Sequence, residues 1–565
     1  MGRRDFVIAS GAALTSLYMP RPNTAVGNGP QHRTVPGADM LLAGALVYDG
    51  TGAPPFEGDV AVAADRIRAV GRSLTAPGAQ RIDLGGLALA PGFIDIHSHT
   101  DIELFVDPRA ESKIRQGVTS EVTGQDGSSL GPWRSDRAAR NRERYRAEYG
   151  VELEFDDVSG FLRALGRHHA SVNLATMVGH GTVRAYVIGD EERPATGNEL
   201  DAMRALVTEA IRAGACGLSS GLEYLPGAFA TLGELVALAE VLHPTGLAYT
   251  SHIRNEDDDL LAAVEEALNV GRMAGVPVQI SHLKAQGRRN WWKAGPVLEA
   301  LEAARTDGID VMYDRYPYVA YSTGLSSLFP VWARSGGVER FLERLADAEL
   351  APRIEREVGE KVALLGDWDA VQVTSTGSQD LEWAAGKRLG ALARERGIEP
   401  YALLTQITRR DRNRSGMVGF GMSEENTARL LSHPLGMVCS DGSALSVDGP
   451  LARGTPHPRN FGTFPRVLGH YCRDGALMPL EAGIHKMTGM PARRLRLRDR
   501  GEIREGMFAD LVAFDPEIVA DRATFERPHQ YPVGIRHVWV NGQFVIVDGE
   551  HTGALPGRVL RPSIG

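Results

Sequence analysis

Two histidines separated by one residue close an apolar run and offer the clearest chemistry in this sequence. They are His97 and His99, at the end of the stretch PGFIDIHSH that occupies residues 91–99. Side chains two positions apart in a β-strand point to the same side, so both imidazoles can bind one ion. The spacing therefore predicts a metal site, although two histidines can also meet by chance in a surface loop.

Two later histidines each end a β-rich run. His252 closes the stretch YTSH and His282 closes QISH, with one helical pattern between the two runs. Because consecutive strands of a parallel barrel end side by side, both imidazoles can reach a site shared with the first pair. A single histidine at a strand end is more often an ordinary core or surface residue, but four in this arrangement favour metal binding.

A carboxylate completes the set of candidate ligands. Asp441 follows the late apolar run MVCS, where it can bind a metal and exchange protons with water held there. Imidazole together with carboxylate suits zinc, whereas calcium and magnesium prefer oxygen ligands throughout. The residue types therefore predict a Zn²⁺ cofactor.

The segments that must position these side chains alternate between strand and helix patterns. Within 260–273, for example, Leu260, Val264 and Leu268 recur at the spacing of one helix face. Such alternation implies parallel strands with crossover helices, and about eight units make a (β/α)8 barrel. We assign residues 91–494 to this α/β barrel, with a charged, mostly helical insertion at about 322–410. The apolar runs expected as strands include 117–123, 173–178, 215–220, 247–252, 276–282, 309–314 and 435–440.

A second, smaller domain is expected from the two ends of the chain. Short β-rich runs separated by Gly and Pro occupy 38–90 and return in 495–565. In the second segment Asn541-Gly542 lies between two such runs, which is the strongest short-range signal for a β-hairpin. We expect both segments to form one small β-sandwich domain.

Composition narrows the kind of partner. The 565 residues exceed the roughly 300 at which a single core stops growing, so more than one domain is expected. A net charge of −9, with no basic stripe and no long uncharged apolar run, argues against nucleic acid and membrane partners. Three widely spaced cysteines indicate neither a disulfide framework nor a thiolate zinc cluster. A small-molecule substrate is expected, and a homo-oligomer is compatible with these features.

The first residues have the pattern of an export signal. Arg3 and Arg4 precede an apolar stretch from Phe6 to Met19, and a segment containing Pro and Asn follows. This order is typical of a cleavable twin-arginine signal. We interpret residues 1–37 as signal and linker and expect a periplasmic protein, whereas a plain N-terminal extension would leave the protein cytoplasmic.

These motifs closely resemble those of the D-aminoacylase (N-acyl-D-amino-acid deacylase) branch of the amidohydrolase superfamily. The resemblance extends from about residue 39 to the C-terminus. It implies a TIM-type metallohydrolase barrel that uses one or two zinc ions to split N-acyl-D-amino acids into a carboxylic acid and a D-amino acid. Further matching motifs are GVT at 117–119, GQDG at 124–127, SHLK at 281–284, YPY at 316–318, HPR at 457–459, FPR at 464–466 and YPVGI at 531–535.

The resemblance also implies roles for the candidate ligands. His97 and His99 would hold one metal position, the two later histidines the other, and Asp441 would act as ligand and proton shuttle. The chain departs from the family at one place, because the better known deacylases carry a bridging cysteine in a GNCG turn where this chain has Asp126. Glu223, at the exit of the run 215–220, is a second candidate, since other amidohydrolases place a bridging carboxylated lysine or glutamate there. We prefer Glu223 slightly, and either carboxylate could instead cap a helix.

Substrate contacts follow from the same resemblance. Lys284, Tyr316 and Arg459 would bind the α-carboxylate of the amino acid, with a weaker contribution from Ser322. Their alternative role is an ordinary solvated charge or packed ring. Members that prefer acidic side chains carry an arginine after the Tyr-Pro motif, whereas residues 321–330 contain no cation. We therefore expect a neutral or apolar substrate side chain, since an unpaired carboxylate is costly to bury.

Three other functions compete with this interpretation. A dipeptidase acting on substrates that end in a D-residue would break the same bond. A cyclic-amide hydrolase of the hydantoinase type needs a lysine at the exit of the central strand, and this chain has none there. A catalytically silent barrel used for assembly would have lost ligands, whereas all four histidines and Asp441 are present.

Overall fold

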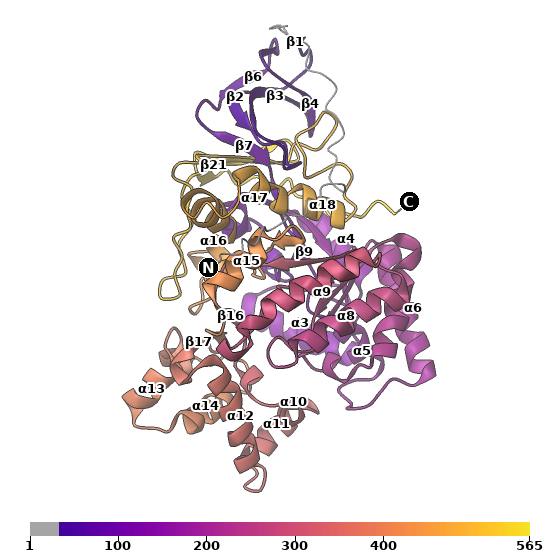
Figure 1. The fold of residues 1–565 in the computed structure, drawn as a ribbon, viewed down its shortest axis with the longest axis vertical. Coiled ribbons are helices and arrows are strands. Elements are labelled where there is room, and N and C mark those ends of the chain that lie inside the picture. The colour runs from indigo at the N-terminus through magenta and orange to yellow at the C-terminus, as the bar shows by residue number, and fades with distance from the viewer. Residues whose placement is uncertain (1–32, 565) are drawn as a thin grey trace, which may run out of the picture.

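The computed structural model describes residues 33–564. A β domain, a barrel and an insertion follow one another from the top to the bottom of the view in Figure 1. The predicted twin-arginine signal lies outside the described residues, and its role stays a prediction.

Parallel strands form the barrel, which confirms the predicted fold class. Their order in space follows their order in the chain, and a parallel bridge between Ser98 and Gly442 brings the last strand back to the first. Only Met177 separates β10 from β11, so these two together occupy one of the eight strand positions. The barrel strands are β8 (Phe93–Asp95), β9 (Val118–Thr123), β10 (Asn173–Thr176), β11 (Val178–Gly179), β12 (Gly217–Gly221), β13 (Ala248–His252), β14 (Val278–Ile280), β15 (Val311–Arg315) and β19 (Gly436–Val438).

Helix α8 (Leu260–Ala274) shows how the sequence produces a barrel helix. Its apolar residues Leu260, Val264 and Leu268 are buried in one cluster with residues of β14 and β15. The helix ends at Gly275, whose φ of 65° is a left-handed conformation that glycine adopts without strain. The other helices around the barrel are α1 (Glu103–Val106), α2 (Glu111–Ile114), α3 (Ser135–Tyr149), α4 (Val158–His168), α5 (His180–Val187), α6 (Gly197–Ala213), α7 (Leu232–Ala239), α9 (Ala294–Thr306), α15 (Glu424–Ser432), α16 (Arg459–Arg466), α17 (Leu480–Met487) and α18 (Gly489–Arg494).

Both ends of the chain contribute to one β domain. Strand β7 (Ala88–Pro91) pairs in parallel with β2 (Met40–Val47) and antiparallel with β20 (Leu511–Phe514), so the nine-stranded sheet contains both segments. At the predicted hairpin, Asn541 and Gly542 have φ values of 48° and 78°, the positive values that a type I′ turn requires. The other strands of the sheet are β3 (Phe56–Ala63), β4 (Arg66–Gly71), β6 (Gln80–Asp83), β21 (Ile535–Val540), β22 (Gln543–Val547) and β23 (Glu550–His551).

The insertion contains more strand than the sequence predicted. A three-stranded antiparallel sheet forms because β18 (Gly416–Gly419) pairs with both β16 (Tyr321–Gly324) and β17 (Val371–Ser375). Since β18 completes this sheet, the inserted unit extends beyond the predicted boundary near residue 410. Its helices are α10 (Val331–Arg334), α11 (Gly337–Ala346), α12 (Ala351–Leu365), α13 (Leu389–Arg396) and α14 (Pro400–Arg410).

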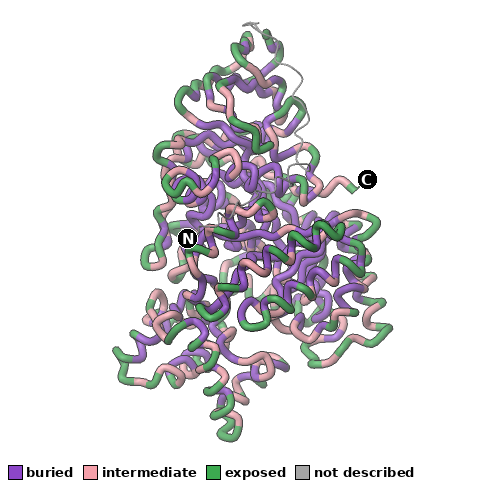
Figure 2. The backbone as a smooth tube through the Cα atoms, viewed as in Figure 1, coloured by how far each residue is buried: buried purple, intermediate pink, exposed green. Residues whose placement is uncertain are grey.

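Buried residues concentrate where the barrel strands and the upper sheet lie, whereas the outer helices expose much of their surface (Figure 2). Within residues 33–564, the helices fall short of the length and apolar character needed to span a bilayer. The barrel strands and the upper sheet thus form the buried core of the molecule.

Candidate metal centre

The candidate ligands all lie at or just beyond the carboxyl ends of barrel strands. His252 is the last residue of β13, and His282 lies two residues after β14. His97 and His99 follow β8, and Asp441 follows β19, which neighbours β8 across the closing bridge. The parallel arrangement thus brings three segments that are far apart in sequence to one end of the barrel.

One group of ligand atoms forms around the first histidine pair. Asp441 Oδ1 lies 3.0 Å from His99 Nε2 and 3.6 Å from His97 Nε2. The two carboxylate oxygens of Asp126 lie 3.5 Å from the same two nitrogens. These four side chains can surround a single ion.

A second group shares Asp126 with the first. Asp126 Oδ2 lies 3.4 Å from His282 Nε2 and 3.8 Å from His252 Nδ1, and these two ring nitrogens are 2.9 Å apart. Asp126 therefore stands between the two histidine pairs, as a bridging carboxylate must.

The slight preference for Glu223 as the bridge is corrected by this geometry. Glu223 Oε2 lies 3.4 Å from His252 Nε2, the ring nitrogen opposite the one that faces Asp126. Among the described residues, its ion pairs involve His252 alone. Glu223 therefore lies beside the centre, where it forms a separate group with His252 and Glu256.

Three candidate ligands have an unusual backbone conformation. The φ angles of Asp126, His282 and Asp441 are 52°, 34° and 50°, in the left-handed region that side chains other than glycine rarely adopt. Such conformations persist only where the surrounding structure holds them, and they cluster at functional sites. The sharp turns after β9, β14 and β19 thus aim these side chains inward.

The residues present fit a zinc ion. In the described part of the chain, both ring nitrogens of His97 and Oδ1 of Asp126 are buried without a hydrogen-bond partner. Because buried polar atoms are nearly always paired, this set of donors is built for a ligand. Imidazole nitrogens with carboxylate oxygens are the donors that zinc prefers.

Carboxylates favour a positive charge on these imidazoles. Burial lowers the pKa of His99, but hydrogen bonds and charge from Asp126 and Asp441 outweigh it and raise that pKa to about 9. Burial of His252 is likewise outweighed, chiefly by the charge of Glu256, and its pKa rises to about 10. The centre therefore attracts cations, whether protons or a metal ion.

Asp441 is held in its ionised form. Burial would raise its pKa, but the charges of Arg459 and His282 outweigh burial and keep the pKa well below its ordinary range. Arg459 Nη1 donates to Asp441 Oδ2 at 2.6 Å, which leaves Oδ1 facing the histidines. Part of the Arg459 guanidinium is thus already engaged, which the sequence did not predict.

The other predicted substrate-binding residues lie beside this centre. Lys284 Nζ donates to Glu256 Oε1 at 2.5 Å and lies 2.7 Å from His282 Nδ1. The Tyr316 ring lies 5.7 Å from Lys284 Nζ and 5.0 Å from the Arg459 guanidinium. Its hydroxyl is buried and has no hydrogen-bond partner among the described residues, so it is available to a ligand.

A cavity of about 1340 Å³ opens over the metal centre. Its walls include predicted metal ligands, Asp126 and Asp441, and predicted substrate-binding residues, Lys284 and Ser322. Aromatic and aliphatic side chains from the insertion complete the far wall. These are Tyr321, Leu328, Phe329, Trp332 and Leu364.

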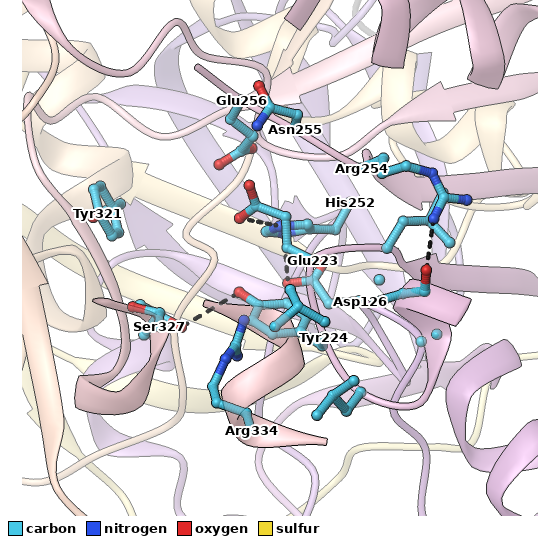
Figure 3. Close-up of a pocket in the computed structure, with 18 of the residues that line it drawn as sticks. Asp126, Glu223, Tyr224, His252, Arg254, Asn255, Glu256, Tyr321, Ser327 and Arg334 are labelled. Carbon is cyan, nitrogen blue, oxygen red and sulfur yellow. Dashed lines mark hydrogen bonds and ion pairs between the residues drawn. The ribbon is translucent and has the colours of Figure 1, made fainter. Parts of the chain in front are cut away.

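Arg334 brings a cation to the cavity from outside the segment 321–330, whose lack of cations was the basis for expecting a neutral or apolar substrate side chain. It ends α10, four residues beyond the segment 321–330, and Figure 3 shows its guanidinium pointing toward Tyr224 and Glu223. Within the described residues it forms no ion pair, and its Nε is buried without a hydrogen-bond partner. Burial lowers its pKa, although the charges of Glu223 and Tyr224 oppose this effect.

Sequence reasoning also missed the residues that orient the histidines. Asp314 Oδ1 lies 3.4 Å from His97 Nδ1 and accepts a hydrogen bond from the His282 backbone N–H at 2.7 Å. Glu256 Oε1 lies 3.1 Å from His282 Nδ1. Carboxylates in this position fix which ring nitrogen faces the metal. Asp314 closes the predicted strand 309–314, so an acidic residue at a strand end was the available signal.

Comparison with known proteins agrees with this geometry. A profile of the amidohydrolase family matches residues 80–354 and 381–546. D-aminoacylase from Alcaligenes xylosoxydans xylosoxydans is 38% identical over 522 residues, which cover 92% of this chain and 97% of the relative. N-acyl-D-aspartate deacylase from the same organism is 38% identical over 529 residues, covering 93% of this chain and 95% of the relative.

A solved structure extends the likeness to the whole fold. N-acyl-D-glutamate deacylase from Bordetella bronchiseptica, complexed with zinc and a phosphonate inhibitor, superposes with a TM-score of 0.77 at 34% identity. The match covers 93% of this chain and 99% of that one. The chain thus belongs to the D-aminoacylase family of metal-dependent amidohydrolases, enzymes that act on N-acyl amino acids.

Proposed function

We propose that this enzyme hydrolyses the amide bond of N-acyl-D-amino acids and releases a carboxylic acid and a D-amino acid. The observation that carries the proposal is the convergence of two histidine pairs with Asp126 and Asp441 at a cavity lined by Lys284 and Arg459, with the Tyr316 ring next to both of these cations. The relatives named above act on this class of substrate.

The residues divide into two metal positions that share one carboxylate. His97, His99 and Asp441 would hold one zinc ion, His252 and His282 the other, and Asp126 would contact both. A bound zinc ion supplies a Lewis acid that polarises the acyl carbonyl and lowers the pKa of water to about 7.

Asp441 is placed to move the proton. Its Oδ1 faces the site, so this oxygen can take a proton from the attacking water and return it to the leaving amine. Arg459 holds the other oxygen by a charge-assisted hydrogen bond, which keeps the carboxylate ionised and fixes its orientation.

Cationic and hydroxyl donors beside Asp441 would bind the α-carboxylate of the substrate. The Tyr316 ring lies next to both Lys284 and Arg459, and its buried hydroxyl has no hydrogen-bond partner among the described residues, so a carboxylate bound there would meet three donors. Ser322 lines the same cavity from β16 and can add a hydrogen bond.

The substrate side chain is proposed to be acidic. Arg334 is a largely buried guanidinium without an ion-pair partner within residues 33–564, and burying an uncompensated charge is unfavourable. A carboxylate on the substrate would compensate it. The deacylases of aspartate and glutamate derivatives among the relatives are consistent with this choice.

A substrate panel tests the proposal. Purified protein, with zinc added or chelated, is assayed on the D and L forms of N-acetylglutamate, N-acetylaspartate and N-acetylleucine, and on dipeptides ending in a D-residue. We expect zinc-dependent release of D-glutamate or D-aspartate to be fastest. Preference for the L forms or for the dipeptides would contradict the proposed substrate, and preference for D-leucine would contradict only the acidic side chain.

A further inference from the structure

A buried lysine outside the ligand set lies beneath one half of the metal centre. Lys113 of α2 is fully buried, at the seam where β19 returns to β8. Its ammonium donates to Asp95 Oδ2 at 2.7 Å, Ser440 Oγ at 2.8 Å and the Gly442 carbonyl at 2.8 Å. Ser98 Oγ follows at 3.2 Å.

These partners are the sequence neighbours of three candidate ligands. Ser98 stands between His97 and His99, while Ser440 and Gly442 stand on either side of Asp441. A single ammonium group therefore ties together the two turns that carry the first metal position.

The backbone around this ammonium is under strain. Asp441 has a φ of 50°, and its N–H donates to the His97 carbonyl at 2.9 Å. His99 N–H donates to the Gly442 carbonyl at 3.0 Å. Because the left-handed turn at Asp441 is unfavourable by itself, it needs fixed neighbours on both sides, and Lys113 supplies a contact to each.

A positive charge is required at the position of the Lys113 ammonium. Asp95 and Glu121 are fully buried carboxylates, and Lys113 Nζ lies 2.7 Å and 3.1 Å from them. Asp95 also accepts the Ser440 backbone N–H at 2.9 Å, so the lysine and this carboxylate act on the same turn from two directions. A neutral side chain could fill the space but could not hold these groups.

We propose that Lys113 is a positioning residue that sets the geometry of the metal position formed by His97, His99 and Asp441. This inference rests on the proposed function as a zinc hydrolase. Removing the ammonium should loosen that position while leaving the pocket for the substrate intact.

The test compares two buried lysines, one on α2 and one on α17, whose ammonium groups lie at opposite ends of β19. Lys113→Met removes the ammonium at the carboxyl end of β19, and Lys486→Met removes one at its amino end. Lys486 is also buried, and its Nζ donates to the carbonyls of His433 and Gly436 at 2.5 Å and 2.8 Å. Both variants lose a buried charge, but only the first lies beneath the ligands.

Zinc affinity is measured by competition with a chelator, geometry by the visible spectrum of the cobalt-substituted protein, and turnover by kcat and KM. In Lys113→Met we expect zinc affinity and kcat to fall by about 10- to 100-fold, the loss typical of residues that orient ligands, with an altered cobalt spectrum and KM within about threefold. Lys486→Met should match the wild type in all three. Equal zinc affinity and equal spectra in the two variants would overturn the inference.

A milder variant covers the case in which Lys113→Met does not fold. Ser440→Ala removes one acceptor of the ammonium and should weaken zinc binding in the same direction; wild-type affinity and spectrum there would overturn the inference. A wild-type protein that binds zinc but cleaves no N-acyl-D-amino acid would contradict the proposed function instead, and the comparison of zinc binding would still decide the role of Lys113.

Discussion

At the residue scale, the role of each carboxylate in metal binding depends on which imidazole nitrogen it faces. Asp126 and Glu223 are both acidic residues just beyond strand ends, and both contact His252, on opposite sides of the ring. Only Asp126 also reaches His97, His99 and His282. A difference of a few ångströms thus separates the proposed bridging ligand from a neighbour of the site.

Paired substitutions at these two carboxylates test the bridge. Asp126→Asn should reduce zinc affinity and kcat at least about 100-fold, because the loss of a shared ligand exceeds that of a residue that only orients ligands. Glu223→Gln should reduce both by no more than about 10- to 100-fold, the loss typical of a residue that only orients a ligand. Zinc content after dialysis measures zinc affinity, and steady-state kinetics measure kcat. A larger loss in Glu223→Gln than in Asp126→Asn would identify Glu223 as the bridge.

Arg334 provides the second test at this scale. Arg334→Met should lower kcat/KM for N-acetyl-D-glutamate about 10- to 100-fold, the value of a hydrogen bond to a charged group, and leave N-acetyl-D-leucine nearly unchanged. The matched control is Arg289→Met, since Arg289 lines the same cavity but is exposed and already paired with Asp258. Equal losses in Arg334→Met and Arg289→Met would argue against recognition of the substrate carboxylate by Arg334. Equal losses of Arg334→Met on the glutamate and leucine substrates would argue against it as well.

At the element scale, the barrel places its functional groups where each strand ends. Helices and buried strands hold the framework, and the strained turns at Asp126, His282 and Asp441 lie directly after β9, β14 and β19. Because several of these turns converge, acidic and imidazole groups crowd together. That crowding couples protonation to zinc binding.

The raised pKa values of His99 and His252 predict a pH dependence. Both folded values, about 9 and about 10, exceed the ordinary value of 6.5. The stability that comes from protonating these imidazoles is therefore complete below pH 6.5 and is lost as the pH rises through 9 to 10. We expect the Tm of the chelated protein to fall between pH 7 and pH 10.

Zinc should reverse this trend, because the metal displaces those protons and binds more tightly as the pH rises. Thermal melts with chelator and with excess zinc measure the difference, which should widen from pH 7 to pH 10. In His252→Asn the decline of the chelated protein should be shallower. A gap that narrows with rising pH would contradict the assignment.

At the scale of the whole molecule, two of the three units build the site. The barrel supplies the ligands, the insertion supplies Tyr321, Trp332 and Arg334 to the cavity wall, and the β domain packs against the barrel. Buried polar contacts join the β domain to Asn173 of β10, which donates to Asp510 Oδ2 at 3.1 Å and accepts from Asn541 Nδ2 at 2.8 Å. Arg500 pairs with Asp510 and donates to Asn541 Oδ1 at 2.8 Å.

This junction should stabilise the molecule without taking part in the chemistry. Arg500→Met leaves the buried carboxylate of Asp510 unpaired, which should lower the free energy of unfolding by about 3–5 kcal/mol. Arg504→Met, which removes an exposed guanidinium near Glu502, should change it by less than about 1 kcal/mol. Denaturant unfolding measures both, and kcat of the folded variants should stay near the wild-type value. A loss of kcat without a loss of stability would contradict this role.

The sequence by itself determined the fold class, the two-ended β domain and the types of ligand. Strand–helix alternation, an H-x-H pair and the hairpin signal Asn541-Gly542 are local patterns, and local spacing decides which side of a strand a residue faces. Tertiary structure alone decided between Asp126 and Glu223, brought Arg334 into the cavity and placed Lys113 beneath Asp441. Those outcomes depend on distances between segments that different strands bring together, and no spacing along the chain encodes them.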